Sequence, residues 1–368
     1  MPFQVQFSDA RARVGSLKTA HGRLQTPFFM PVATKGVPKL VDCSELEEMG
    51  YCCFISNAFL LSLKPGVPII EQHGGLHAFM DWKHSIFTDS GGFQVLNGKF
   101  AQKVVSEGVW MKSPFDGTQQ LLTPEKAVSI QNQLDSDVAM CLDDVPHFGN
   151  SRAQFASSLK RTLSWAERCK AVHSNSHQLL FGISQGGTFS DLRKKGIEAL
   201  LKLDFDGIAL GGLCIGEGAA LMEKTVKASM KYIPSSKPVY LMGVGSIDDI
   251  LDSIALGVDI FDSAFPTRMA RHGHVFTSRG DLRLDKKQYA SDFSPLDEGC
   301  SCPACTRHTR AYLHHLLRVK EPTGLRLLSH HNLQFLEHAI ERARQAIRSG
   351  EFASFRKSFS ATRSSQSV

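Results

Sequence analysis

Long apolar segments are missing from this 368-residue chain. No stretch near 18 residues is free of charges and glycines, so we expect no membrane span. The start, MPFQVQFSDARAR, has no apolar core of the kind that secretory signals carry. Cysteines are few and odd in number, nine with Cys52 and Cys53 adjacent, which does not fit a disulfide framework. These absences indicate a soluble protein of the reducing cytoplasm.

Two further absences narrow the class. Neither sign of charge dominates, since 42 Lys and Arg face 36 Asp and Glu for a net charge of +6. This balance allows a polyanionic partner without requiring one. No G-x-G-x-x-G motif opens the first helix, which argues against a doubly wound dinucleotide-binding sheet. We also find no internal repeat.

Eight short, nearly continuous apolar runs are present, and such runs are typical of parallel strands covered on both faces. They span 27–34, 52–60, 85–93, 136–144, 178–187, 206–213, 238–245 and 258–267. Helix-like segments lie between most of them, most clearly at 151–172, 190–203 and 246–257. The alternation predicts an α/β protein with a (β/α)₈ TIM barrel; the alternative is a doubly wound open sheet.

The remaining segments suggest how the barrel is extended. Residues 95–134 are too long for a simple crossover and predict an excursion over the barrel rim. We expect a surface helix at 331–352 and no order in the Ser/Arg-rich end. The predicted parts are an amino-terminal cap at 1–26, the barrel at 27–289, a zinc-binding subdomain with the carboxyl-terminal helix at 290–352, and a disordered tail at 353–368.

A cysteine cluster near the carboxyl end indicates a metal site. Cys300, Cys302 and Cys305 form C-x-C-x-x-C, so three thiolates converge within six residues and one imidazole would complete a tetrahedral Zn²⁺ site. Spacing leaves His308, His330 and His331 open as the fourth ligand. Four protein ligands leave no position for water, so we interpret the zinc as structural.

Polar residues close six of the eight apolar runs, where a barrel carries its active site. They are Asp89, Asp143-Asp144, Gln185-Gly186-Gly187, Gly211-Gly212, Gly243 to Gly245 and Asp262. Any one of them is explained as a loop-start residue. Six together favour a pocket.

The residue types suggest chemistry on a nucleotide. Paired carboxylates such as Asp89 and Asp262 serve glycosidic bonds, one as nucleophile and one as proton donor and acceptor. Asp143, Gln185 and the Gly212 N–H match the Watson–Crick edge of an extruded guanine. Phe93 and Met242 are placed to sandwich its ring. Arg268, Arg271 and His272 are placed to hold phosphates.

Together these motifs resemble one family. DSGGFQ, ISQGG, ALGGL-x-x-GEG, YLMGVG, FDSAFPTR and C-x-C-x₂-C-x₂₅-H are similar, in order and over about residues 10–355, to the tRNA-guanine transglycosylases, or queuine tRNA-ribosyltransferases. The resemblance implies a zinc-containing TIM barrel, commonly a homodimer. It implies exchange of guanine 34 in the anticodon loop of GUN tRNAs for a 7-deazaguanine, queuine or preQ1, in queuosine synthesis.

Carried over by position, the resemblance assigns roles. It implies Asp262 as the nucleophile on ribose C1′, Asp89 as general acid and base, and His331 as the fourth ligand of one structural Zn²⁺ per subunit, with Cys300, Cys302 and Cys305. The implied base-binding residues are Asp89, Ser90, Gly91, Gly92, Phe93, Asp143, Gln185, Gly212 and Met242. The implied RNA-contacting residues are Gly243, Val244, Gly245, Ser246, Ile247, Asp248, Asp249, Thr267, Arg268, Met269, Ala270 and Arg271.

Two departures bear on the substrate. Asp144-Val145 stands where typical bacterial members have Glu-Cys, and it resembles the eukaryotic catalytic subunit. Cys214-Ile215 keeps the bacterial pattern where eukaryotic members prefer glycine at the second position. The mixed pocket favours queuine narrowly over preQ1. A non-catalytic partner subunit of a two-subunit enzyme and an archaeal-type transglycosylase acting elsewhere on tRNA are the alternative functions.

Overall fold

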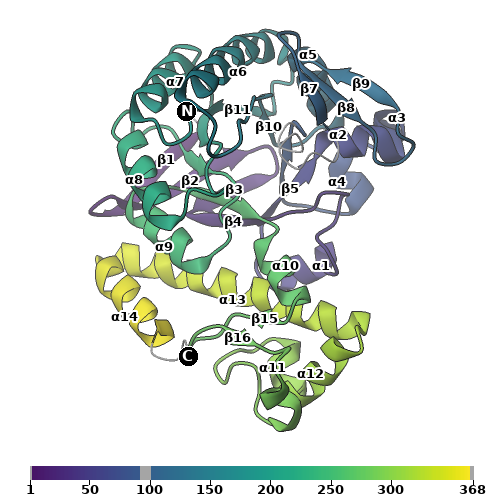
Figure 1. The fold of residues 1–368 in the computed structure, drawn as a ribbon, viewed down its shortest axis with the longest axis vertical. Coiled ribbons are helices and arrows are strands. Elements are labelled where there is room, and N and C mark those ends of the chain that lie inside the picture. Colours follow the sequence, from purple (N-terminus) through teal and green to yellow (C-terminus); the bar gives the residue numbers. More distant parts are fainter. Residues whose placement is uncertain (1, 92–100, 365–368) are drawn as a thin grey trace.

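The eight apolar runs form one closed parallel barrel. The structure, a computed structural model, describes residues 2–91 and 101–364 (Figure 1). The strands are β4 (Phe28–Pro31), β5 (Cys53–Asn57), β6 (Ser85–Asp89), β10 (Val138–Met140), β11 (Leu179–Ser184), β12 (Gly207–Leu210), β13 (Val239–Leu241) and β14 (Ile260–Ser263). They neighbour one another in chain order, and β14 pairs with β4. A bridge between Val32 and Ile55 joins β4 to β5. The TIM barrel is confirmed and the open sheet is wrong.

Helices cover the outside of the barrel because their apolar stripes pack on its strands. They are α1 (Cys43–Glu48), α2 (Ala58–Leu61), α3 (Val67–Gln72), α4 (Gly75–Met80), α5 (Pro124–Leu134), α6 (Arg152–Val172), α7 (Ser190–Lys202), α8 (Ala219–Ser229), α9 (Ile247–Ala255) and α10 (Phe265–Arg271). The expected helices at 151–172, 190–203 and 246–257 correspond to α6, α7 and α9. Ser151 starts α6 with a capping box to Gln154. No described helix is long and apolar enough to cross a bilayer.

Side chains fill the barrel interior. The rings of Phe28, Phe181 and Tyr240 meet that of Phe87 edge-on at centroid distances of 6.2, 5.8 and 6.2 Å. The antiparallel sheet of β1 (Phe3–Asp9), β2 (Ala12–Thr19) and β3 (Gly22–Thr26) adds Phe3 and Leu17 to the same buried cluster. This packing closes the barrel at the amino ends of its strands. A pocket can therefore form only at their carboxyl ends.

A buried ion pair and a buried carboxylate tie the amino-terminal sheet to the beginnings of the strands. Arg13 pairs with Asp259, just before β14. The Asp137 carboxylate, just before β10, accepts hydrogen bonds from the backbone N–H groups of His21 (2.9 Å) and Ile86 (2.8 Å). It also bonds His21 Nδ1 at 3.0 Å and His77 Nε2 at 2.9 Å, and the two imidazoles stack at 3.6 Å. Four donors satisfy this buried carboxylate, so its role here is structural.

The excursion expected at 95–134 is a small sheet followed by a helix. The described strands β7 (Ala101–Val104), β8 (Val109–Lys112) and β9 (Gln119–Leu122) pair antiparallel before α5. Trp165 of α6 donates from its indole nitrogen to Ser106 O at 2.8 Å. This contact ties the excursion to the helix layer.

Beyond the barrel the chain builds a smaller unit on one long helix (Figure 1). It contains β15 (His274–Val275), β16 (Leu282–Arg283), a 3₁₀ turn (Lys287–Ser291), α11 (Pro303–Arg307), α12 (Arg310–Arg318), α13 (Pro322–Ser349) and α14 (Phe352–Ser364). Asn332 of α13 accepts from Phe276 N–H and donates to Pro266 O and His274 O, which locks α13 to α10. The helix expected at 331–352 therefore begins earlier and buries one whole face.

The disordered tail expected at 353–368 is wrong for the part of it that the structure describes. Helix α14 continues to Ser364. Phe352, Phe355 and Phe359 recur at helical spacing, and the Phe359 ring lies 6.5 Å from that of Phe335 on α13. Ser/Arg-rich composition hid this apolar stripe, whose burial stabilises the helix.

Candidate functional site

The carboxyl ends of the strands bring the expected polar residues together. Asp89 ends β6 and Asp262 lies near the end of β14. Asp143 follows β10, and Gln185 follows β11. Asp143 and Gln185 are buried. Four segments far apart in the sequence thus contribute to one mouth of the barrel.

Two donors hold the Asp262 carboxylate. The Tyr240 hydroxyl donates to Oδ1 at 2.6 Å and the Gly243 N–H donates to the same oxygen at 2.8 Å. Burial raises the pKa of Asp262, while these two hydrogen bonds act against the rise. The donors favour the ionised form and fix its orientation, as a carboxylate nucleophile requires.

Asp89 occupies a different electrostatic environment. Burial raises its pKa to about 7, and the negative charges of Asp262 and Asp143 add to the rise. The Gly91 N–H, at 3.0 Å from Oδ1, and the side chain of Asn57 on the neighbouring strand oppose it. A carboxyl group that titrates near neutrality can both give and take a proton. The charges of Asp262 and Asp143 both act on Asp89, as expected of carboxyl groups at the same end of the barrel.

Asp143 and Gln185 lie side by side at the same end of the barrel. Gln185 Nε2 donates to Asp143 Oδ2 at 2.6 Å. Burial raises the pKa of Asp143 to about 7, against the effect of that hydrogen bond. A Cβ on Gly211 would lie 2.6 Å from Gln185 Nε2, and one on Gly212 would lie 2.3 Å from Gln185 Oε1. Glycine at both positions therefore allows the amide to pack against this backbone.

The other expected pocket residues divide into three groups. Ser90 is buried beside Asp89, and Gly91 has a φ of +83°, which favours glycine. Met242 is half-buried and packs on the barrel interior. Gly92 and Phe93 lie outside the described residues. Asp144, next to Asp143, pairs instead with Arg161 of α6 at 2.6 Å.

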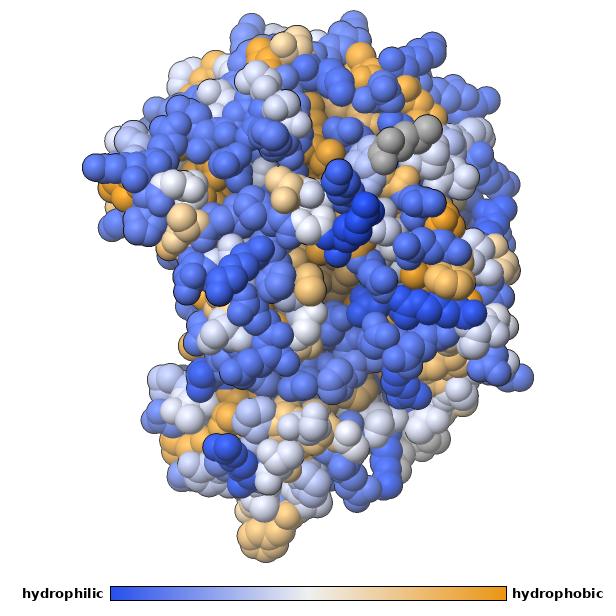
Figure 2. All heavy atoms as spheres, turned by 180° about the vertical axis from the view of Figure 1, so that it is seen from behind, coloured by the Kyte–Doolittle hydropathy of each residue, from blue (hydrophilic) through white to orange (hydrophobic). Residues whose placement is uncertain are grey.

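The two expected RNA-contacting segments follow β13 and β14 and are partly buried. The side chains of Val244, Ile247, Thr267 and Ala270 are buried, so they support these segments from within. Arg268 is exposed on α10, with its guanidinium 5.9 Å from the Phe265 ring centroid. Figure 2 shows the face opposite to that of Figure 1, where strongly hydrophilic side chains surround a central hollow.

The sequence did not predict a role for three residues near the carboxyl ends of the strands. Asn57 and Tyr240 stand within apolar runs that predict packing, although each contacts a carboxylate of the pocket. Arg193 stands in a charged stretch of α7 typical of a solvated surface, yet it is fully buried. A polar residue inside an apolar run, such as Asn57, was the one available signal.

The cysteine cluster and one histidine form a metal-binding arrangement. His331 Nδ1 lies 3.6 Å from Cys300 Sγ and 3.3 Å from both Cys302 Sγ and Cys305 Sγ. Ligand bonds of about 2.0 and 2.3 Å in a tetrahedron predict N···S distances of about 3.6 Å, so the four groups fit a zinc ion.

A hydrogen bond on the far side of the imidazole ring selects the ligand atom. His331 Nε2 lies 2.7 Å from Phe276 O, so its N–H donates there and the Nδ1 lone pair faces the thiolates. The cluster contains His331 and neither His308 nor His330.

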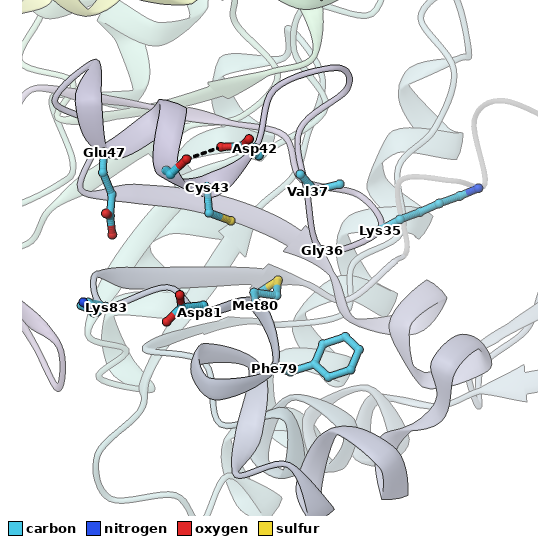
Figure 3. A pocket seen from close by; sticks show the side chains of 11 residues that line it. Lys35, Gly36, Val37, Asp42, Cys43, Glu47, Phe79, Met80, Asp81 and Lys83 are labelled. Atoms are coloured by element: carbon cyan, nitrogen blue, oxygen red, sulfur yellow. Dashed lines mark hydrogen bonds between the residues drawn. The ribbon is translucent and has the colours of Figure 1, made fainter.

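A separate surface cavity of about 460 Å³ lies between α1 and α4 (Figure 3). Ser44 Oγ donates to Asp42 Oδ1 at 2.7 Å on its rim. It shares no residue with the carboxylate pocket, being lined by Lys35, Gly36, Val37, Asp42, Cys43, Ser44, Glu47, Phe79, Met80, Asp81 and Lys83.

Comparison with known proteins gives one consistent result. The family model described as queuine tRNA-ribosyltransferase matches residues 8–365. A queuine tRNA-ribosyltransferase of Halothermothrix orenii is 44% identical over 351 residues, which are 95% of this chain and 94% of the relative. One of Caldanaerobacter subterraneus is 45% identical over 360 residues, covering 97% and 96%. One of Geobacillus kaustophilus is 45% identical over 349 residues, covering 95% and 92%.

Proposed function

The chain belongs to the queuine tRNA-ribosyltransferase family, and from this we propose that it exchanges guanine 34 in the anticodon loop of GUN tRNAs for a 7-deazaguanine. The observation that carries the proposal is the unequal pair of carboxyl groups at one barrel mouth. Hydrogen bonds from Tyr240 and Gly243 oppose the rise that burial causes in the pKa of Asp262, whereas the pKa of Asp89 is raised to about 7.

The first displacement uses Asp262 as nucleophile. Its carboxylate oxygen bonds to ribose C1′ while the C1′–N9 bond breaks and its electron pair leaves with guanine. Asp89 in its protonated form supplies the proton that neutralises the departing base. The product is an ester between Asp262 and the tRNA, with guanine released.

The second displacement reverses these roles. Asp89, now a carboxylate, takes the N9 proton of the incoming 7-deazaguanine. The nitrogen then attacks C1′ and the bond to Asp262 breaks. Two inversions at one carbon retain its configuration, as in retaining glycosidases.

Recognition of the base falls to the pocket wall. The Asp143 carboxylate accepts from N1–H and the exocyclic amine, and the Gln185 amide and the Gly212 N–H donate to O6. Ser90, Gly91 and Met242 line the same pocket. Val145, buried beside Asp143, and Ile215 border the region where queuine and preQ1 differ. This mixed pair supports queuine narrowly over preQ1.

Three further assignments belong to the proposal. One Zn²⁺ per subunit, bound by Cys300, Cys302, Cys305 and His331, joins the loop before α11 to α13 and has a structural role. The tRNA backbone meets the 243–249 and 267–271 segments. The enzyme works as a homodimer.

The alternative functions are disfavoured by particular observations. A non-catalytic partner subunit has no use for a carboxylate held by a buried tyrosine, as Asp262 is. An archaeal-type enzyme acting elsewhere on tRNA is disfavoured because relatives 44–45% identical over 95–97% of this chain are named queuine tRNA-ribosyltransferase.

Trapping of the covalent ester tests the proposal. Enzyme mixed with a GUN tRNA transcript should give a slower band on a denaturing gel, and Asp262→Asn should abolish it. Asp144→Asn is the matched control, because that carboxylate pairs with Arg161 outside the pocket. Absence of an adduct and of guanine exchange in the unaltered enzyme would refute the function. Exchange assays with queuine and preQ1 then decide the base, and turnover of preQ1 alone would overturn the preference for queuine.

A further inference from the structure

Arg193 is a buried cation that contacts the base pocket from behind. It lies on α7, is fully buried, and has no carboxylate partner in the part of the chain that the structure describes. Its guanidinium donates to three backbone carbonyls: Nε to Gly187 O at 2.7 Å, Nη1 to Ser184 O at 2.8 Å and Nη2 to Gly211 O at 2.8 Å. Burial lowers its pKa to about 10, so it remains charged at neutral pH.

All three carbonyls belong to the segments that form the pocket wall. Ser184 precedes Gln185, Gly187 lies two residues after it, and Gly211 precedes Gly212. Gly187 and Gly212 have φ values of +56° and +65°, a region in which the backbone depends on glycine and on its hydrogen bonds. One side chain thus fixes the ends of β11 and β12 relative to each other.

The bond to Gly211 O also orients a donor. In a planar trans peptide the C=O of one residue and the N–H of the next point in opposite directions. Because Arg193 binds Gly211 O, the Gly212 N–H points away from α7. That N–H has no hydrogen-bond partner among the described residues, and Gln185 packs directly against Gly212.

We propose that Arg193 is a positioning residue for base recognition, which holds Gly211 O and thereby aims the Gly212 N–H at O6 of the bound purine. This inference rests on the proposed function. A charge-assisted bond to the carbonyl also polarises the peptide and strengthens its N–H as a donor. Arg193 touches neither the sugar nor Asp89 nor Asp262, so it acts on base affinity and not on the chemical steps.

The test compares two bases that differ at one atom. Guanine has O6, whereas 6-thioguanine keeps N1–H and the amine but has sulfur, a weak acceptor, at that position. In Arg193→Met we expect the KM for guanine in tRNA exchange to rise about tenfold, as for loss of one well-placed hydrogen bond. The Ki of 6-thioguanine should rise less than about threefold, and kcat should stay within about twofold.

Controls separate positioning from general support. Arg13 is a second buried arginine, which donates to Ser235 O and Lys237 O at the opposite mouth of the barrel. Arg13→Lys should lower thermal stability and leave the KM for guanine and the Ki of 6-thioguanine unchanged. If Arg193→Met fails to fold, the milder variant Arg193→Lys replaces it. This variant should raise the KM for guanine more than the Ki of 6-thioguanine.

Two outcomes overturn the inference in different ways. Equal losses for guanine and 6-thioguanine, or a fall in kcat with unchanged KM, would make Arg193 a structural brace only. If the unaltered enzyme exchanges guanine, such a result leaves the proposed function standing. If the unaltered enzyme does not exchange guanine, the function falls and this inference falls with it.

Discussion

The Tyr240 hydroxyl lies 2.6 Å from Oδ1 of Asp262, so a side chain of the barrel interior donates a hydrogen bond to the proposed nucleophile. Tyr240 is fully buried and its ring packs edge-on against Phe87. Burial and the nearby Asp262 charge raise the pKa of the phenol well above its usual value, so it stays a donor. The packed core thereby fixes the orientation of a catalytic group.

Removal of this donor should change the acid limb of the rate profile. In Tyr240→Phe the pKa of Asp262 rises, since a bond that favours its ionised form is lost. We expect kcat at neutral pH to fall about tenfold, in line with loss of a hydrogen bond to a charged group. The acid limb of kcat against pH should move to higher pH. Tyr51→Phe is the control, because Tyr51 is equally buried but donates to Leu333 O; an unshifted limb in Tyr240→Phe would contradict the role.

The ionised carboxylate of Asp89 should lower the free energy of unfolding at neutral and higher pH. Its folded-state pKa of about 7 exceeds the ordinary aspartate pKa of 3.8, so the folded state binds the proton more tightly than the unfolded state between these values. Stability therefore falls as pH rises through that window. Asp89→Asn removes the loss and should stabilise the protein at pH 8, by at most about 4 kcal/mol for a shift of this size. Thermal unfolding at pH 5 and pH 8 measures this, and an equal effect at both would show that burial is incomplete.

Asp137 at the opposite mouth should show the reverse sign. Burial opposes its ionisation, but hydrogen bonds from His77, Ile86 and His21 outweigh it and hold the pKa below the usual value. Its contribution is therefore present above the unfolded-state pKa and is lost as pH falls through the lower folded-state pKa. Asp137→Asn should destabilise by about 2 kcal/mol at pH 7 and by less near pH 3.5. Denaturant titrations over that range check it; a constant difference would refute the linkage.

The Cys/His cluster should retain zinc through purification. Metal analysis is expected to find one zinc per chain, and Cys302→Ala should lose it, because three ligands bind far more weakly than four. Chelation should lower the melting temperature, since α11 and α13 are then joined only by packing. Cys52→Ala is the control, as Cys52 is exposed and outside the cluster. Full zinc content in Cys302→Ala would contradict the assigned ligand set.

The barrel could be predicted because its strands are buried on both faces. Continuous apolar runs identify such strands, although their ends do not: the run at 258–267 holds both β14 and the first residues of α10. Strand ends of a barrel share one rim, so Asp89, Asp143 and Asp262 could be placed together before any coordinates.

Tyr240, Arg193 and α14 were not predicted, and the physical reason is the same for all three. Tyr240 and Arg193 act from within the packed protein, and their contacts depend on strands and a helix that are distant in sequence. The charged neighbours of Arg193 in α7 predict a solvated face, and only tertiary packing reverses that. The helix α14 was hidden in the same way, because serine and arginine outnumber the phenylalanines that bury its stripe.

Arg268 should contribute to tRNA binding through charge alone. It is exposed on α10, six residues after Asp262, and faces the ring of Phe265 without an ion pair among the described residues. Arg268→Ala should weaken tRNA binding about three- to tenfold near 0.1 M salt and reduce the slope of log K against log salt by about 1, as loss of one phosphate contact predicts. The KM for free guanine should not change. Arg283→Ala supplies the comparison, because Arg283 is exposed but already paired with Asp285 at 3.1 Å, and its slope should match that of the unaltered enzyme. If Arg268→Ala raises the KM for guanine as much as the Kd for tRNA, the residue supports the pocket instead of the RNA backbone.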